Sequence, residues 1–174
     1  MSESVAGPAS RPLAAGERSA LAPQPLVHWR EPMGILNLRG DPRDPGLRAA
    51  VQAVMGAGLP PSPGGVASGS VWRIVAAGPD DWFLIGPAEG IGPMADAMTR
   101  ALGGLNTALT DVSSGYRLLH LGEPGAVDLL AQGCPLDLHP RVFREGQCAG
   151  SHFFKASVWL WRASDGIELL VRRS

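Results

Sequence analysis

The sequence predicts an α+β protein made of two consecutive split βαβ units, of which the second is incomplete. Three observations support this fold class. Apolar residues recur with strand and helix periods in the order β-α-β-β-α-β over residues 33–112. The order β-α-β-β then begins again over residues 113–174. Beyond the N-terminal stretch, the glycines and prolines, 23 and 16 in the whole chain, fall between these elements or at their ends.

The first unit has the element order of a ferredoxin-like fold and is expected to begin near Met33. Asp44 is a good N-cap, Pro45 fits the first position of a helix, and Gly56 fits its end. A Gly-Pro-Asp-Asp turn predicts a hairpin. The elements predicted from these signals are strands at residues 35–39, 71–76, 82–85 and 107–112, and helices at residues 45–55 and 93–102.

The second unit is predicted to stop before it is complete. Asp165-Gly166 is a strong hairpin signal between its last two strands. One more helix and one more strand would be needed to match the first unit. Either the native chain is longer, or a partner covers the face that is left open. The predicted elements are strands at residues 116–121, 153–162 and 167–171, and a helix opened by Glu123 and Pro124.

Residues 1–32 are predicted to form a flexible tail. Of the first 25 residues, 16 are Ala, Pro, Ser or Gly, and such a segment buries too little apolar surface to offset the entropy lost on ordering. The alternative is an arm that becomes ordered against a partner. The two parts expected are therefore this tail and a domain at residues 33–174, with units at 33–112 and 113–174.

Composition excludes several classes of protein. A formal net charge of −1 gives no basic surface for nucleic acid. No run of about 18 apolar residues is present, which predicts no membrane span. The first residues lack the apolar core of a secretory signal. Two cysteines do not make a disulfide framework, so we expect a reducing, cytoplasmic location.

The sequence offers no catalytic or metal-binding motif. It has neither a P-loop nor a G-x-S-x-G elbow. Cys134, His139, Cys148 and His152 invite a zinc interpretation, but their spacing lacks the paired cysteines of a structural site, and two free thiols and two ordinary histidines explain them better. Cys134 follows a helix end, where the dipole opposes thiolate formation. We therefore expect no catalytic residue and no metal.

Five residues are candidates for contact with a partner or a ligand. Asp137, His139 and Arg141 alternate with leucines and would share one face of an extended segment, as a solvated edge or as a polar anchor for a partner. Trp159 and Trp161 share one face of a strand whose other face is also apolar. That pattern fits burial in the core, a partner interface, or stacking on a planar ligand.

Several runs resemble the gamma subunit of heterotetrameric sarcosine oxidase. The most specific is Gly-Cys-Pro-Leu-Asp-Leu-His-Pro at residues 133–140. The closing Val-Arg-Arg-Ser at residues 171–174 is also similar to that family. The resemblance extends over roughly residues 33–174, and its remaining parts lie at residues 35–42, 59–61 and 78–82.

The resemblance implies a fold like that of the aminomethyltransferase (folate-binding) proteins. It also implies a non-catalytic subunit that packs against the alpha and beta, and delta, subunits of the oxidase. Such a complex oxidises sarcosine to glycine and passes the one-carbon unit to tetrahydrofolate. FAD, FMN, NAD and tetrahydrofolate would then be held by the other subunits. The alternative is a stand-alone folate-binding or aminomethyl-transferring protein of the same fold.

Overall fold

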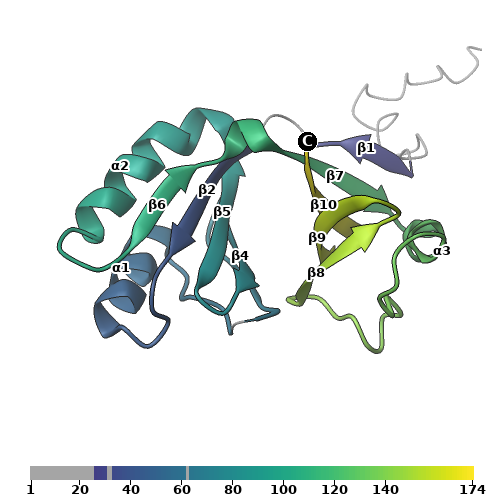
Figure 1. The fold of residues 1–174 in the computed structure, drawn as a ribbon, viewed down its shortest axis with the longest axis horizontal. Helices are drawn as coiled ribbons and strands as arrows, with labels where there is room; N and C mark the ends of the chain where they lie inside the picture. The colour runs from purple at the N-terminus through teal and green to yellow at the C-terminus, as the bar shows by residue number, and fades with distance from the viewer. Residues whose placement is uncertain (1–25, 31–32, 62) are drawn as a thin grey trace, which may run out of the picture.

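The computed structural model describes residues 26–30, 33–61 and 63–174. Two five-stranded antiparallel sheets pack against each other, and helices cover their outer faces (Figure 1). The first sheet has the strand order β3-β4-β5-β2-β6 and the second has β1-β7-β10-β9-β8. The α+β class and the two units predicted from the sequence are therefore present.

The first unit is a ferredoxin-like split βαβ unit with one added edge strand, β3. Its first and third strands, β2 and β5, lie at the centre of the sheet, and α1 and α2 cover one face. The elements are β2 (Met33–Arg39), α1 (Pro45–Met55), β3 (Val66–Ser68), β4 (Arg73–Gly78), β5 (Asp81–Pro87), a short 3-10 helix (Ala88–Gly90), α2 (Ile91–Ala101) and β6 (Ala108–Asp111).

Helix α1 begins and ends as the sequence predicts. The Asp44 carboxylate accepts a hydrogen bond of 2.7 Å from the Gly46 amide, and proline occupies the first turn. Gly56 ends the helix with φ at 69°, in the left-handed region that glycine adopts without strain. Leu47 and Val51 point into the core and are completely buried.

The second unit repeats the first, strand for strand. Read from one edge, β8-β9-β10-β7-β1 corresponds to β3-β4-β5-β2-β6, and α3 takes the place of α1. No counterpart of α2 lies within residues 116–172, all of which are described. The elements are β7 (Tyr116–Gly122), which follows a 3-10 turn (Ser113–Gly115), α3 (Ala126–Ala131), β8 (Cys148–Phe153), β9 (Ala156–Ala163) and β10 (Gly166–Arg172).

Strand β1 (Val27–Trp29) corrects the prediction that residues 1–32 form one flexible tail. It pairs antiparallel with β7, with Val27 opposite Leu121 and Trp29 opposite Leu119. It thus fills the edge position that β6 holds in the first sheet. Three residues paired with partners about 90 positions later leave no local signal, which is why the sequence did not predict this strand. Residues 1–25 lie outside the described residues.

Three further boundaries differ from the prediction. Strand β4 begins at Arg73 rather than at residue 71, and the short strand β3 just before it was not predicted. The strand predicted at residues 153–162 corresponds to β9, which begins at Ala156 because the chain turns at Phe154, whose φ of 51° is left-handed. Strand β8, which ends just before that turn, was not predicted.

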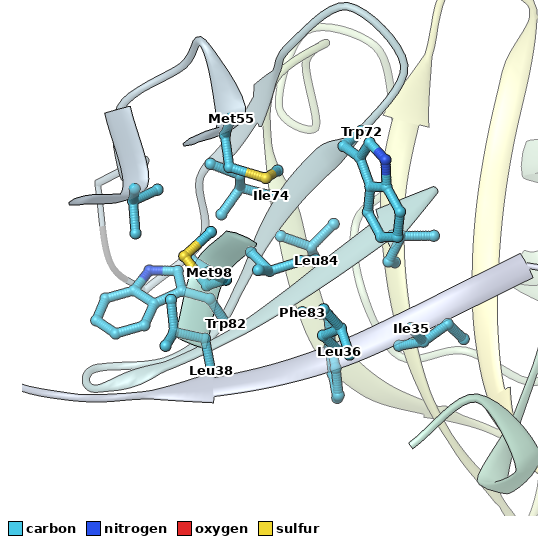
Figure 2. Packing of buried hydrophobic residues seen from close by; sticks show 14 of the residues in the cluster. Ile35, Leu36, Leu38, Met55, Trp72, Ile74, Trp82, Phe83, Leu84 and Met98 are labelled. Atoms are coloured by element: carbon cyan, nitrogen blue, oxygen red, sulfur yellow. The ribbon is translucent and has the colours of Figure 1, made fainter. Parts of the chain in front are cut away.

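Strand β5 is buried on both faces. The helices cover one face, and the second sheet covers the other. Trp82 and Leu84 face the helices and are completely buried. Phe83 faces the second sheet, where its ring meets Tyr116 and Trp159 edge-on at 5.3 and 5.2 Å between centroids. Side chains of this first cluster gather around β2, β4 and β5 in Figure 2. The larger core therefore extends from the helices through the first sheet to the second.

Candidate functional site

A mostly apolar hollow lies where the two sheets meet. Its volume is about 560 Å³, within the range of small-molecule pockets. Its walls are mostly apolar but include two arginines and two serines. The lining residues are Trp29, Arg30, Met33, Ile35, Ala88, Ser113, Ser114, Tyr116, Arg117 and Leu118.

Strand β1 brings an exposed apolar surface to one side of this groove. Trp29 is 64% exposed, and Leu26 and Val27 are each more than 40% exposed. Because β1 is the last strand of its sheet, one of its edges has no neighbouring strand in the described part of the chain. Large exposed apolar side chains that lie together mark an interaction surface more often than isolated ones do.

A buried charge cluster lies on the inner face of the second sheet. Glu168 and His120 face each other across β10 and β7, and each is no more than 3% exposed. The Arg30 guanidinium donates to Glu168 Oε1 from Nη2 at 2.6 Å and from Nε at 3.0 Å. Arg30 Nη2 also lies 3.0 Å from His120 Nδ1. The cluster therefore joins the residue after β1 to the two central strands of the sheet.

The hydrogen bond between Arg30 and Glu168 dominates the electrostatics of Arg30. The hydrogen bond to Glu168 is the main reason why the pKa of Arg30 lies above its usual value, against the opposing effect of burial. Nδ1 of His120 lies between the Arg30 guanidinium, 3.0 Å from Nη2, and the Glu168 carboxylate, 3.2 Å from Oε1. The other ring nitrogen, Nε2, faces the Asp165 carboxylate at 3.7 Å.

Two smaller hollows also border Arg30. One, of about 540 Å³, includes His28, His120, Glu123 and Asp165 in its lining. The other, of about 230 Å³, includes Arg73, Trp161 and Glu168. Sequence reasoning did not select Arg30, His120 or Glu168. The available signal was a polar residue, His120 or Glu168, flanked on both sides by apolar residues in each of two strands, because such a residue is buried only with a partner.

The structure places Asp137, His139 and Arg141 in an irregular turn rather than on an extended face. All three are exposed. The Asp137 carboxylate accepts from the His139 amide at 3.0 Å, and His139 Nδ1 accepts from the Arg141 amide at 3.2 Å. These side chains therefore shape the chain locally. The intervening Leu138 is buried in a second core cluster, which lies on the α3 side of the second sheet and includes Leu130, Leu160 and Ile167.

Trp159 and Trp161 lie on the inner face of β9, between the two sheets. Trp161 is 1% exposed, and the Arg73 guanidinium lies over its ring at 5.8 Å. Trp159 is partly buried and donates to the Ala77 carbonyl at 3.5 Å. On the other face, Val158 and Leu160 belong to the second cluster. Both faces of β9 are thus covered within this chain, as in a core strand.

The two thiols lie in different clusters. Cys148 belongs to the first core, where its thiol donates to the carbonyls of Gly65 and Ala76, and burial raises the pKa of that thiol to about 11. Cys134 belongs to the second core, with its sulfur 3.6 Å from the Ser151 hydroxyl. Within the described ranges, no three histidine, cysteine or acidic side chains are grouped to hold a metal ion.

None of the helices in the described part of the chain is long and apolar enough to cross a bilayer. The outer helices are short amphipathic elements that pack on the sheets.

Comparison with known proteins identifies the family. A family model described as the sarcosine oxidase, gamma subunit family matches residues 39–174. A sarcosine oxidase subunit gamma from an Arthrobacter species is 36% identical over 118 residues, which are 67% of this chain and 57% of that relative. The match thus spans little more than half the length of that relative.

Two solved structures are similar in fold. A chain of the heterotetrameric sarcosine oxidase from Corynebacterium sp. U-96, in complex with pyrrole 2-carboxylate, superposes with a TM-score of 0.76 at 30% identity over 84% of this chain and 74% of its own length. Aminomethyltransferase T of the glycine cleavage system from Bartonella henselae gives a TM-score of 0.58 at 13% identity over 83% and 41%. The second likeness shows the folate-binding type of fold and nothing more. On the family match, this chain belongs to the sarcosine oxidase gamma subunit family.

Proposed function

We propose that this chain is a non-catalytic gamma subunit of a heterotetrameric sarcosine oxidase. The observation that carries the proposal is its 30% identity and TM-score of 0.76 with a chain of such an oxidase. The complex would oxidise sarcosine to glycine and pass the one-carbon unit to tetrahydrofolate. This chain would contribute a packing surface rather than reacting groups.

The partners in this proposal are the alpha, beta and delta subunits. FAD, FMN, NAD and tetrahydrofolate would be bound by those subunits, and the complex would work in the cytoplasm. Consistent with this role, the two buried charged or polar residues of the described part, His120 and Glu168, lie against each other and against Arg30. The polar atoms of these three side chains are 2.6–3.2 Å apart.

A stand-alone folate-binding or aminomethyl-transferring role has less support. It rests on the likeness to aminomethyltransferase T, which at 13% identity concerns the fold alone.

Co-expression tests the proposal. The alpha, beta and delta subunits of the same source are produced with and without this chain, and the product is measured by size-exclusion chromatography and sarcosine oxidation. We expect the complex to contain one copy of this chain per assembly and to lose stability or activity without it. A complex of unchanged stability and activity in its absence would refute the subunit role. Titration of the isolated chain with tetrahydrofolate checks the stand-alone alternative, which micromolar stoichiometric binding would favour.

A further inference from the structure

A row of side chains crosses the inner face of the second sheet. Strand pairing places Cys148, Trp161, Glu168, His120 and His28 side by side, one on each of the five strands. Three polar atoms of this row, His28 Nδ1, Trp161 Nε1 and Glu168 Oε2, are buried without a hydrogen-bond partner among the described residues. Because an unpartnered buried polar atom costs free energy, a folded protein keeps few of them, and a group of three calls for an explanation.

Two of these three atoms belong to residues that line one hollow. Trp161 and Glu168 both line the hollow of about 230 Å³, which lies between β3 and β4 of the first sheet and the β9–β10 hairpin of the second. Of the three hollows that border Arg30, only this one is lined by Glu168. An unpartnered donor and an unpartnered acceptor thus belong to the walls of the same small space.

Arg73 supplies this hollow with a cation that has no partner. It is half-buried on β4, and its guanidinium lies 5.8 Å from the centre of the Trp161 ring. Its side chain forms no ion pair with any carboxylate among the described residues. A guanidinium has five N–H donors and binds a carboxylate with two of them at once. Arg73 is therefore a positive pole suited to a carboxylate, and its long side chain can turn to admit one.

The opposite pole of the hollow is Glu168. Arg30 binds Oε1 and leaves Oε2, which as a carboxylate oxygen can only accept a hydrogen bond. An ammonium group would give Oε2 a charge-assisted hydrogen bond, which is the stronger kind. Three arginines and three carboxylates line the hollow, so their formal charges cancel, and a ligand that carries both charges matches it better than a simple ion does. These six residues are Arg30, Arg73, Arg162, Glu145, Asp165 and Glu168.

We propose that this hollow binds a small amino acid as its zwitterion, with the carboxylate on Arg73 and Trp161 Nε1 and the ammonium group on Glu168 Oε2. The volume of about 230 Å³ is below that of pockets for drug-sized ligands, so it admits glycine or sarcosine and excludes an aromatic amino acid. The inference goes beyond the proposed function, because it gives this chain a ligand of its own, and it holds whether or not the chain joins an oxidase.

Titration of the full chain with small probes, followed by ¹H–¹⁵N NMR, tests the site. The reporter is the indole N–H resonance of Trp161, which is identified by its loss in Trp161→Phe. Glycine and sarcosine should shift this resonance in a saturable way. Glycolate lacks the ammonium group and ethanolamine lacks the carboxylate, so each should bind at least about 10-fold more weakly than glycine. L-tryptophan should leave the resonance unchanged, because it is too large for the hollow.

An arginine variant and a matched control locate the binding. Arg73→Met removes the guanidinium and should weaken glycine binding at least about 10-fold. Arg48→Met is the control, since Arg48 is exposed on α1, outside the lining of the hollow, and it should stay within about twofold. Equal urea midpoints of unfolding show that each variant is folded, and Arg73→Gln replaces Arg73→Met if that variant is not.

Three results would overturn the inference. If no probe shifts the Trp161 indole resonance, the hollow holds solvent alone. If glycolate binds as tightly as glycine, the site recognises an anion rather than a zwitterion. If Arg73→Met binds glycine like the wild type, the amino acid binds elsewhere. None of these results bears on the subunit role, which the co-expression experiment tests separately.

Discussion

At the scale of single residues, the buried carboxylate of Glu168 depends most on its neighbours, because its charge must be paired inside the protein. Oε1 accepts both hydrogen bonds from Arg30, whereas Oε2 is buried with no partner among the described residues. A buried ion is tolerated only when its charge is paired, and a broken pair leaves the other ion uncompensated. Arg30 directly follows β1, so its ion pair with Glu168 also holds the end of that strand against the sheet.

Glu168→Gln should therefore destabilise the protein by about 2–3 kcal/mol, because it leaves the Arg30 charge half-buried beside His120. The matched control is Asp80→Asn, which breaks the pair with Arg39 at 3.0 Å. Both partners of that pair are 50% exposed, so its loss should cost clearly less than the loss of the Glu168 pair. Urea unfolding at neutral pH measures both changes. Equal costs for the two variants would show that burial adds nothing to the Glu168 pair.

At the scale of elements, local signals were predictable and distant pairings were not. The N-cap Asp44, the C-cap Gly56 and the turn at residues 78–81 act through neighbours in sequence, and α1 and the β4–β5 hairpin were predicted from them. Strand β1 depends on residues about 90 positions away, so no short window contains its signal. The same holds for the candidate site, because Arg30 and Glu168 are 138 positions apart.

The contact between Trp72 and β5 also could not be predicted from the sequence, and it gives an element-scale prediction. A Cβ at Gly86 would overlap the Trp72 indole, which packs against the backbone there. Gly86→Ala should destabilise the protein by about 1–3 kcal/mol through overpacking. Gly92→Ala is the control, since a Cβ at this position of α2 meets nothing within 4 Å, and it should be neutral or slightly stabilising. Thermal melts of the two variants compare them, and equal melting temperatures would contradict the close packing.

At the scale of the whole molecule, the two units share one interior although each has its own helices. The first core cluster includes Tyr116, Leu118 and Trp161 from the second sheet. The sequence predicted that both faces of the strand containing Trp159 and Trp161 are apolar. It left open whether core, partner or ligand covers them, because a periodic pattern shows that a face is buried and does not show by what.

That shared interior predicts coupled unfolding of the two sheets. Trp159→Ala removes the ring that contacts both Phe83 and Tyr116, and should cost about 2–3 kcal/mol. Val142→Ala, at a residue 56% exposed, should cost less than about 0.5 kcal/mol. Native-state hydrogen exchange measures the free energy at which each amide opens. In Trp159→Ala, the amides of β8 and β9 should open at a lower free energy than those of β2 and β5, whereas in the wild type the two groups should open at the same free energy. If the two groups keep the same relative protection in the variant, the sheets are not coupled through this ring. The second sheet would then hold its inner face by other contacts, of which the Trp161 and Leu170 packing is the next to test.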